Sequence, residues 1–250
     1  MELSYSAWTH VGRRSNNEDA HAVCLDLGLC VVADGMGGYE GGEVASQIVI
    51  DALVDLFART ERDAEATWPH APRPEREQLV DRVAVGLRHA HASVVARREG
   101  RLAQMGSTAS VMAWQGERLV IGHVGDSRVY RLRGGKLRQL TSDHSFAEEA
   151  RRAGADAVAE RYRHMLTRVV GMPGPLDADV YCGRLRPGDV MLLCSDGVWE
   201  PLTEEQITTT LARDPASAVR SLVDAAYDAG GTDNMTAVVL RVAGDDAVLA

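Results

Sequence analysis

Four short strand-like segments between residues 107 and 140 constrain the fold more than any other part of the sequence. Two of their connections are the two-residue turns Gln115-Gly116 and Gly134-Gly135. A two-residue turn joins neighbouring antiparallel strands, whereas parallel strands need a much longer crossover. The run therefore predicts an antiparallel sheet. Its four predicted strands are 107–114, 118–124, 128–133 and 136–140.

The rest of the chain alternates between strand-like and helix-like patterns. Further strands are expected at 4–9, 20–25, 29–33, 179–183, 190–194 and 235–242. Apolar residues three and four positions apart predict helices at 43–59, 75–98, 203–213 and 216–229. Residues 60–74, with three prolines, are expected to form a loop, and residues 141–171 an insertion of short helices over the sheet. Strands at both ends with helices between them predict one α+β domain over residues 1–250, in which helices cover two packed antiparallel sheets.

One predicted strand ends in an acid that is followed by several glycines, whose backbone no side chain covers. The apolar run 31–33 leads directly into Asp34, and three of the next four residues are glycines. Glycine lets a ligand approach the main chain closely, so the Asp34 carboxylate and the Gly35 carbonyl suit a hard cation. For this stretch alone, an Asp-Gly surface turn is an equally good interpretation.

The same arrangement recurs at other strand ends. An acid stands beside a predicted strand at Glu18 and Asp19, at Asp126, at Asp196 and at Asp233. Acids are rarely buried unless they are paired or bind metal, and each of these sites taken singly is explained by a turn. Five such places in one chain favour convergence on a metal site.

Composition excludes several kinds of partner. The chain has a net charge of −9, which argues against nucleic acid as the main partner, because binding the phosphate backbone needs a basic face. No apolar run is long enough to span a bilayer, and the first residues lack the features of a signal peptide. We therefore expect a cytoplasmic protein with no membrane partner.

The four cysteines show no spacing typical of metal or redox sites. Cys24, Cys30, Cys182 and Cys194 each lie in an apolar, strand-like context, so we expect them to be buried and reduced. The eight histidines form no HExxH or paired pattern, which argues against a zinc site of the imidazole kind.

Five motifs occur in order along almost the whole chain. They are RSNNEDA at 14–20, VADGMGG at 32–38, GDSR at 125–128, CSDGVW at 194–199 and GTDN at 231–234. With these motifs the chain resembles the PP2C (PPM) family of metal-dependent serine/threonine protein phosphatases, in its compact bacterial form. The resemblance implies a four-layer αββα sandwich and hydrolysis of phosphoserine and phosphothreonine in proteins with Mn²⁺ or Mg²⁺.

The resemblance also implies roles for the residues of the central metal site. Asp34 is expected to bridge two metal ions, with the Gly35 carbonyl completing one coordination shell. Asp196 and Asp233 are expected to bind the first ion. Together with Arg14, these three aspartates form the expected catalytic set.

The remaining motif residues are expected to surround that centre. Glu18 serves the second ion, with Asp19 helping through a water molecule. Asp126, together with Asp196, is the expected contact for a weaker third ion. Arg14 matches the arginine that binds the substrate phosphate.

The chemistry of these residues agrees with the resemblance. An all-oxygen ligand set suits Mg²⁺ or Mn²⁺ rather than zinc. Two cations about 3.5–4 Å apart can hold a water molecule, lower its pKa and direct it at phosphorus. A guanidinium group binds phosphoryl oxygens bidentately. No protein nucleophile is then needed, and the chain has neither a Ser-His-Asp order nor a Cys-x5-Arg signature.

The sequence departs from the family pattern where a general acid is expected. Met36 and Tyr39 occupy positions at which other members carry histidine. Water on a metal ion or His144 is then the candidate acid. For His144 we prefer a role in tying down the segment that corresponds to the family's flap, at about 143–170. Arg128 is either catalytic or, as we prefer, part of a structural ion pair.

The expected function is that of a bacterial phosphatase that acts on phosphorylated proteins and opposes a partner serine/threonine kinase. Control of type VI secretion is one setting, on weak analogy. The alternatives are a phosphoprotein-binding module without turnover and a small-molecule phosphoesterase on the same fold. The family suggests a monomer.

Overall fold

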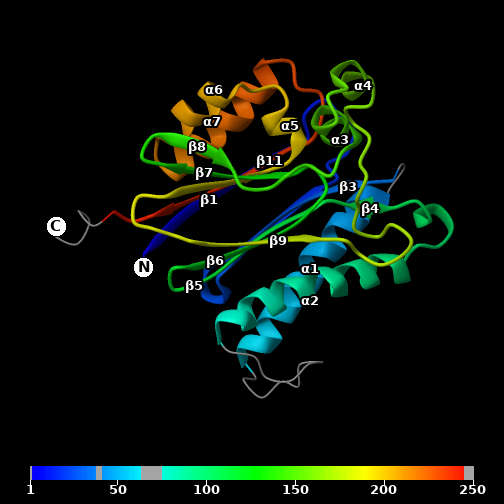
Figure 1. Cartoon of the computed structure of the whole chain (residues 1–250), viewed down its shortest axis with the longest axis horizontal. Coiled ribbons are helices and arrows are strands. Elements are labelled where there is room, and N and C mark those ends of the chain that lie inside the picture. The colour runs from blue at the N-terminus through cyan, green and yellow to red at the C-terminus, as the bar shows by residue number, and fades with distance from the viewer. Residues whose placement is uncertain (1, 38–40, 63–74, 245–250) are drawn as a thin grey trace.

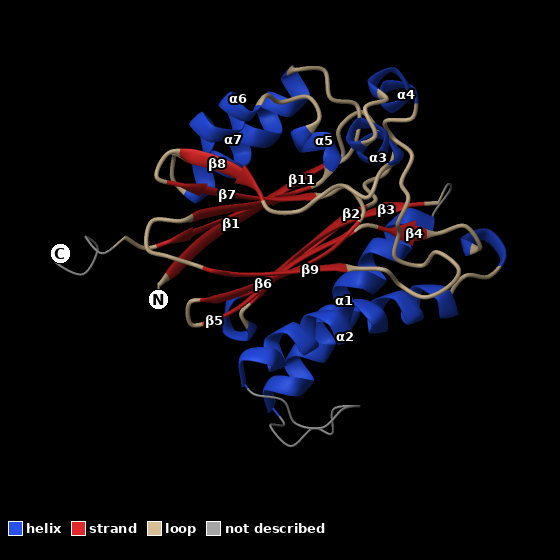
Figure 2. Cartoon of the chain, in the orientation of Figure 1, coloured by secondary structure: helices blue, strands red, loops and turns tan. Residues whose placement is uncertain are grey.

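Two sheets lie face to face between two layers of helices in the computed structural model, which describes residues 2–37, 41–62 and 75–244 (Figure 1). Every strand pair in both sheets is antiparallel. Figure 2 shows the strands at the centre of the molecule and the helices on the outside. The predicted αββα sandwich is therefore confirmed.

Sheet A contains both ends of the described chain. Its order is β1-β11-β10-β7-β8, which leaves β1 and β8 as the two edges. The first strand pairs with the last along its whole length, from Leu3 opposite Val242 to His10 opposite Met235. The strands are β1 (Leu3–His10), β7 (Arg128–Arg133), β8 (Lys136–Gln139), β10 (Val190–Cys194) and β11 (Met235–Val242).

Sheet B follows the order β2-β3-β5-β6-β9, with the short strand β4 beside the end of β3. The predicted hairpins in this part of the chain are present. The strands are β2 (Asp19–Cys24), β3 (Leu29–Met36), β4 (Gly106–Ser107), β5 (Ala109–Gln115), β6 (Arg118–Val124) and β9 (Asp179–Arg184).

Helices cover the outer face of each sheet (Figure 1). The long pair α1 (Gly41–Arg62) and α2 (Glu75–Ala96) packs on sheet B. The shorter helices α5 (Asp196–Trp199), α6 (Glu204–Leu211) and α7 (Pro215–Asp228) pack on sheet A. The predicted capping box opens α6, because the Thr203 and Gln206 side chains each accept a hydrogen bond from the other residue's backbone N–H.

Three apolar clusters fill the spaces between the four layers. Leu53 and Phe57 of α1 are fully buried against sheet B, and Leu222 of α7 is fully buried against sheet A. Between the sheets, Met112 and Leu193 are 1% and 0% exposed. Burial of this extent on both faces of each sheet holds the strand ends in fixed positions.

The flap, residues 143–170, contains α3 (Phe146–Arg152) and α4 (Asp156–Arg161). The predicted short helices are present, but the flap stands at one end of the sandwich beside α5 and does not lie over a sheet (Figure 1). Single bridges join Ser107 to Val170 and Ser145 to Leu166. The first bridge attaches the flap to β4, and the second joins the two arms of the flap to each other.

Strand β3 continues three residues beyond its predicted end. Gly35 pairs with Ser107 and Met36 with Gly106, so β4 prolongs the ladder past Asp34. The predicted strand 107–114 is accordingly two strands. It breaks at Thr108, whose Oγ1 accepts a hydrogen bond of 2.9 Å from the Asp34 backbone N–H.

The prediction that all four cysteines are buried is wrong for two of them. Cys30 and Cys194 are fully buried, Cys24 is partly exposed, and Cys182 is exposed. Cys24 and Cys182 lie on β2 and β9, the two edge strands of sheet B. An edge strand has a neighbouring strand on one side only, so its side chains are less fully covered. All four are free thiols.

Other differences concern element ends. The predicted loop 60–74 begins later, because α1 runs to Arg62, and residues 63–74 lie outside the described part of the chain, as does Tyr39. Single turns of 3-10 helix occupy Leu25–Leu27 and Gly100–Leu102. No helix in the described ranges combines the length and apolar character that a bilayer-spanning segment needs.

Candidate active site

The predicted acids lie where strands of both sheets end, near the flap. In sheet B, the β2–β3 register places Asp19 directly opposite Asp34. In sheet A, Asp126 lies two residues before β7, Asp196 two residues after β10 and Asp233 two residues before β11. Because β7, β10 and β11 are antiparallel neighbours, these three ends meet at the same edge.

Gly35 lets α1 begin against the end of β3. A Cβ on Gly35 would lie 2.0 Å from the Gly42 carbonyl oxygen and 2.7 Å from that of Glu18. The Gly35 N–H donates to the Glu18 carbonyl at 3.1 Å, and the Ser46 hydroxyl donates to the same oxygen at 2.6 Å. Any larger residue at position 35 would separate Glu18 from the strand that carries Asp34.

The loop that carries Arg14 is fixed to the loop before β11. Gly12 has a φ of +64°, and a Cβ there would lie 1.9 Å from the Asp233 carbonyl oxygen. The Asn234 side chain donates to the Asn16 carbonyl at 2.9 Å and accepts from the Glu18 N–H at 2.8 Å. The two loops therefore hold each other in place.

These residues surround one open cleft of about 1250 Å³. Flap residues 163–166 and the loop 229–234 contribute to its lining. Asp19 is not part of that lining, and its Oδ2 accepts a hydrogen bond of 2.7 Å from Ser195. The predicted site residues that do line the cleft are Arg14, Glu18, Asp34, Gly35, Asp126, Asp196 and Asp233.

The carboxyl groups raise one another's affinity for protons. Burial, followed by repulsion from Asp19 and Asp196, raises the pKa of Asp34 well above its ordinary value. Burial and repulsion from Asp196 do the same to the pKa of Asp126. Burial is also the main cause that raises the pKa of Asp19 to about 7 and that of Asp196 to about 6. Asp34 and Asp196 both line the cleft, and each acts on the other's pKa.

Two carboxylate oxygens in this cluster are buried without a hydrogen-bond partner among the described residues. They are Oδ1 of Asp19 and Oδ1 of Asp196. Leaving a buried acceptor unsatisfied is costly, so each such oxygen needs an explanation. An oxygen-only donor set of this kind fits Mn²⁺ or Mg²⁺, which would satisfy these oxygens and offset the repulsion.

Arg14 is the cation that opposes these acids at the mouth of the cleft. Its Nη2 donates to Asp233 Oδ2 at 2.7 Å, and this hydrogen bond is the main cause that raises the pKa of Arg14. Burial, partly opposed by Arg14, raises the pKa of Glu18.

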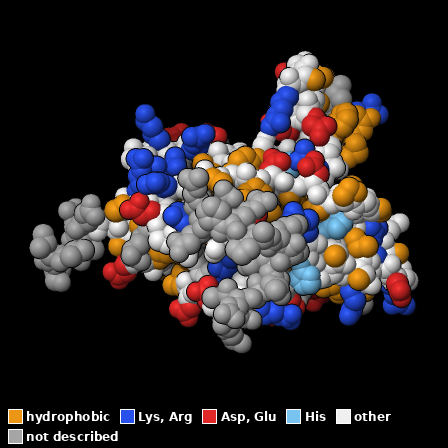
Figure 3. Space-filling model, turned by 60° about the horizontal axis from the view of Figure 1, so that its bottom comes forward, with side chains coloured by type: hydrophobic (Ala, Val, Ile, Leu, Met, Phe, Trp, Pro, Cys, Tyr) orange, Lys and Arg blue, Asp and Glu red, His pale blue; other side chains and the backbone are white. Residues whose placement is uncertain are grey.

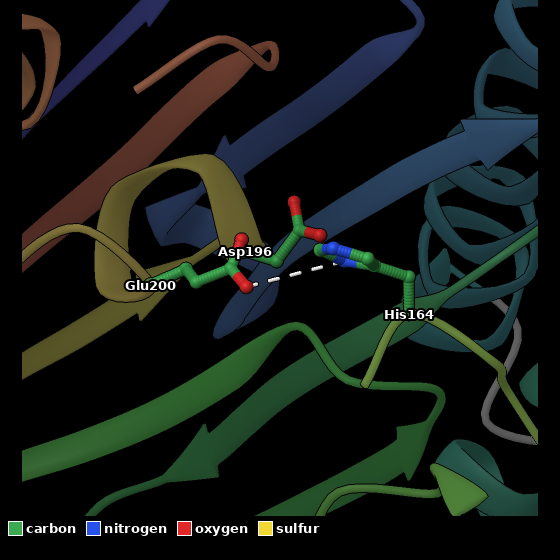
Figure 4. Close-up of side chains that lie close together, drawn as sticks. All are labelled: His164, Asp196 and Glu200. Carbon is green, nitrogen blue, oxygen red and sulfur yellow. Dashed lines mark ion pairs between the residues drawn. The ribbon is translucent and has the colours of Figure 1, made fainter. Parts of the chain in front are cut away.

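The flap supplies a residue that the sequence analysis missed. His164 points toward Asp196 and Glu200, and one potential ligand atom from each of the three lies within 4.8 Å of the others (Figure 4). His164 Nδ1 lies 3.9 Å from Glu200 Oε1. Three donors at this spacing could hold a metal ion. Glu200 is the C-cap residue of α5, four residues after Asp196, a spacing that the sequence displays. No pattern in the flap points to His164.

Arg128 forms the expected ion pair beside the site. Its guanidinium donates to both oxygens of Asp143, with a shortest distance of 2.6 Å. Its guanidinium carbon lies 3.3 Å from the centre of the Trp199 ring. Arg128 does not line the cleft, so its contacts favour the structural interpretation.

His144 connects the flap to the sheet ends beside it. Its Nδ1 accepts from the Gly125 N–H at 3.2 Å, and its Nε2 lies 3.3 Å from Asp179 and 3.2 Å from Arg168 Nη1. The side chain is 5% exposed and does not line the cleft, and burial lowers its pKa. These contacts favour the role of tying down the flap over that of a general acid.

Comparison with known proteins agrees with this geometry. The chain matches the family described as protein phosphatase 2C over residues 8–237. It is 34% identical to the serine/threonine protein phosphatase PstP of Mycobacterium tuberculosis over 250 residues, covering 97% of this chain and 45% of PstP. The chain thus spans less than half the length of that relative.

Two solved structures are also similar. The catalytic domain of PstP in complex with two manganese ions has a TM-score of 0.81 and 33% identity, over 96% of this chain and 98% of that one. PppA of Pseudomonas aeruginosa, described as a key regulatory component of T6SS, has a TM-score of 0.77 and 30% identity, also over 96% and 98%. The motifs, the sandwich and the match across residues 8–237 lead to one conclusion: the chain belongs to the protein phosphatase 2C family.

Proposed function

We propose that this chain is a divalent-metal-dependent phosphatase that removes phosphate from phosphoserine and phosphothreonine in proteins. The observation that carries the proposal is the gathering of carboxylates from both sheets around one open cleft, with Arg14 at its mouth. Family membership supports the same reaction.

Two ions of Mn²⁺ or Mg²⁺ are assigned to the centre of the cleft. In this proposal the Asp34 carboxylate would hold both ions and the Gly35 carbonyl would contribute a ligand to one of them. Asp196 and Asp233 hold the first ion. The complex of PstP with two manganese ions supports this number of ions.

The outer ligands complete the assignment. Glu18 serves the second ion, and Asp19 assists it through water. Asp126 and Asp196 hold a third, weaker ion. When bound, the ions supply positive charge to the phosphoryl group and activate a water molecule for attack.

The protein's own groups bind and orient the substrate. Arg14 is 59% exposed and faces the cleft, so its planar guanidinium can bind two phosphoryl oxygens. The bonds from Asn234 to Asn16 and Glu18 keep the Arg14 loop in register with Asp233. This fixed geometry positions the phosphate for in-line attack without a protein nucleophile.

A protein substrate is favoured over a small metabolite by the form of the cleft. Small-molecule pockets are commonly enclosed and of about 300–1,000 Å³, whereas this cleft is open and of about 1250 Å³. An exposed phosphorylated segment can enter it without unfolding the flap. The proposal includes a partner serine/threonine kinase, since only such an enzyme supplies these substrates.

The proposal extends to a physiological setting. The similarity to PppA, described as a regulator of T6SS in Pseudomonas aeruginosa, supports control of a type VI secretion component. Deletion of the gene in its host, followed by phosphoproteomics, is expected to raise phosphorylation of such a component. If the phosphorylation of all secretion components were unchanged, the protein would not control type VI secretion. The proposed phosphatase reaction would be unaffected by that result.

Phosphate release from a phosphothreonine peptide tests the reaction. We expect turnover with Mn²⁺ or Mg²⁺, none in excess chelator, and much slower turnover of nucleotides and sugar phosphates. Asp34→Asn serves as the inactive control. Peptide binding without phosphate release would identify a binding module, and faster turnover of a free nucleotide or sugar phosphate would identify a small-molecule phosphoesterase.

A further inference from the structure

A cluster of cations lies along one edge of sheet A, away from the cleft. Antiparallel pairing in the β7–β8 hairpin places Arg131 directly opposite Arg138 and Arg133 directly opposite Lys136. Like charges that face each other across two strands are destabilising. In Figure 3, Lys and Arg side chains gather at the upper left of the molecule. A chain with a net charge of −9 thus concentrates positive charge at one place.

Most of this charge has no internal counter-charge. Asp189 is fully buried, and both of its carboxylate oxygens accept hydrogen bonds from Arg133, the second at 2.6 Å. No carboxylate in the described ranges forms an ion pair with Arg131, Lys136 or Arg138. The cluster therefore attracts an anion from outside.

Arg131 carries a second, independent sign of a missing partner. Its Nε is buried and has no acceptor among the described residues. Burial, followed by repulsion from Arg133, lowers the pKa of Arg131. Attraction to Asp189 opposes this shift, and Arg138 and Arg186 add smaller repulsion. Lys136 and Arg138 are exposed beside Arg131, so an incoming carboxylate can reach the cluster through these two side chains.

The adjoining backbone indicates what kind of anion fits. Strand β8 is the last strand of sheet A and pairs only with β7. Its outer N–H and C=O groups can pair with an extended peptide, which a vesicle or a nucleic acid cannot do. A short acidic segment would cover the cations without meeting the acidic remainder of the protein.

We propose that Arg131, Lys136 and Arg138, on the β7–β8 edge, form a docking site for an acidic, extended segment of the substrate protein. This proposal rests on the proposed phosphatase function, because it places a second contact on the same substrate. Arg131 lies five residues after Asp126, which precedes β7, so the two are at most about 17 Å apart at roughly 3.3 Å per residue. About five extended residues between the phosphoresidue and the acidic residues are therefore enough for one segment to reach both sites.

Direct binding tests the docking site without catalysis. The probe is a fluorescent, unphosphorylated peptide with six consecutive glutamates, and its anisotropy is measured against the whole chain. We expect binding that weakens at least fivefold in Arg131→Gln/Arg138→Gln and in the single exposed variant Arg138→Gln. The matched control is Arg88→Gln/Arg97→Gln, which removes one exposed arginine on α2 and one directly after it. Equal binding by wild type and the β7–β8 variants, or no binding at all, would overturn the proposal.

Kinetics then connect docking to substrate choice. Three phosphothreonine peptides share one core: one has six glutamates ten residues away, one has six glutamines there, and one has the glutamates two residues away. We expect the first to have a KM roughly five- to tenfold lower than the others. This advantage should disappear in Arg131→Gln/Arg138→Gln and at 0.5 M NaCl, while turnover of p-nitrophenyl phosphate stays unchanged.

The outcomes separate this proposal from the proposed function. Equal KM values for all three peptides would overturn docking and leave the phosphatase assignment standing. Peptide binding at the cluster by a protein that hydrolyses none of the peptides would overturn the phosphatase assignment and substrate docking together, leaving only a peptide-binding edge. Tighter binding to phosphatidylserine vesicles than to the glutamate peptide would identify a membrane contact and overturn the proposal. Self-association of Arg131→Gln/Arg138→Gln without peptide binding would show that the charges only protect the sheet edge.

Discussion

The Arg14 guanidinium donates a hydrogen bond of 2.7 Å to the Asp233 carboxylate, so the proposed phosphate ligand and a proposed metal ligand contact each other directly. Their side chains are 59% and 37% exposed. An ion pair as exposed as this adds little stability and is easily exchanged for another partner. When metal binds Asp233 and phosphate binds Arg14, the ion pair between the two residues can therefore be exchanged for one metal contact and one phosphate contact.

Arg14→Ala is expected to raise KM for a phosphothreonine peptide roughly 10- to 100-fold, because hydrogen bonds to charged groups are worth about 1.5–3 kcal/mol. The kcat should change less, since phosphate binding contributes to ground state and transition state alike. Steady-state kinetics check this, with Arg14→Lys as the partial control. A wild-type KM in Arg14→Ala would show that another residue binds the phosphate.

Asp34→Asn and Asp233→Asn are each expected to reduce turnover at least about 100-fold, since each removes a charged metal ligand. In chelator, Asp34→Asn should also melt above the wild type, because repulsion within the acid cluster is relieved. The rise should be roughly 2–4 °C for each kcal/mol relieved. Calorimetric Mn²⁺ titration and thermal melts test both effects. Undiminished turnover in either variant would contradict the metal assignment.

Asp126→Asn should lower turnover while the two central ions stay bound, because Asp126 is assigned only to the weaker third ion. The check is a crystal structure of the variant grown with Mn²⁺, together with its metal stoichiometry. Loss of both central ions in that crystal would show that Asp126 belongs to the central site.

Stability of the metal-free protein should fall as pH rises from about 4 to about 7. The pKa of Asp196 is raised to about 6 and that of Asp19 to about 7, from an ordinary value near 3.8. In this window the folded state holds more protons than the unfolded state, so raising the pH favours unfolding, on the order of a few kcal/mol in total.

Urea denaturation in chelator at pH 4.5 and pH 7.5 measures this effect, and the same titration with saturating Mn²⁺ is the control. Because the ions compete with protons for the same oxygens, Mn²⁺ should stabilise the protein much more at pH 7.5 than at pH 4.5. Equal stabilisation at both pH values would mean that the raised pKa values do not belong to the metal-binding groups.

Arg128→Ala should destabilise the fold by roughly 3–5 kcal/mol, because it leaves the buried Asp143 carboxylate without its cation. Saturating Mn²⁺ should not restore the lost stability. Arg138→Ala on the same hairpin is the surface control, and chemical denaturation of both variants measures the difference. A loss below about 1 kcal/mol would show that the pair is as weak as an exposed one.

The sequence predicted the architecture well because its signals were local. Glycine turns and short apolar runs fixed the hairpins of sheets A and B, and the capping pattern at Thr203 located the start of α6. Element ends were less predictable. The extension of β3 to Met36 depends on pairing with Gly106, about 70 residues away, which no local pattern reports.

The candidate site could be listed from motifs but not assembled from them. Every acid in the motifs was identified, yet only the fold shows that Asp19 accepts from Ser195 and does not line the cleft. His164 could not be found at all, because its proximity to Glu200 depends on how the flap returns to the body. The cation cluster likewise depends on the hairpin register, which places Arg131 opposite Arg138 and which no local sequence pattern reports.

The position of Asp19 opposite Asp34 makes correct pairing of β2 with β3 sensitive to ions while the chain is still folding. Successive side chains in a strand point to opposite faces, so a slip of one residue would separate the two carboxylates. In an ion-free solution, the repulsion between the two carboxylates favours the slipped pairing. A divalent cation held by Asp34 directly and by Asp19 through water would offset this repulsion, and would thereby favour the correct strand pairing before it takes part in any reaction.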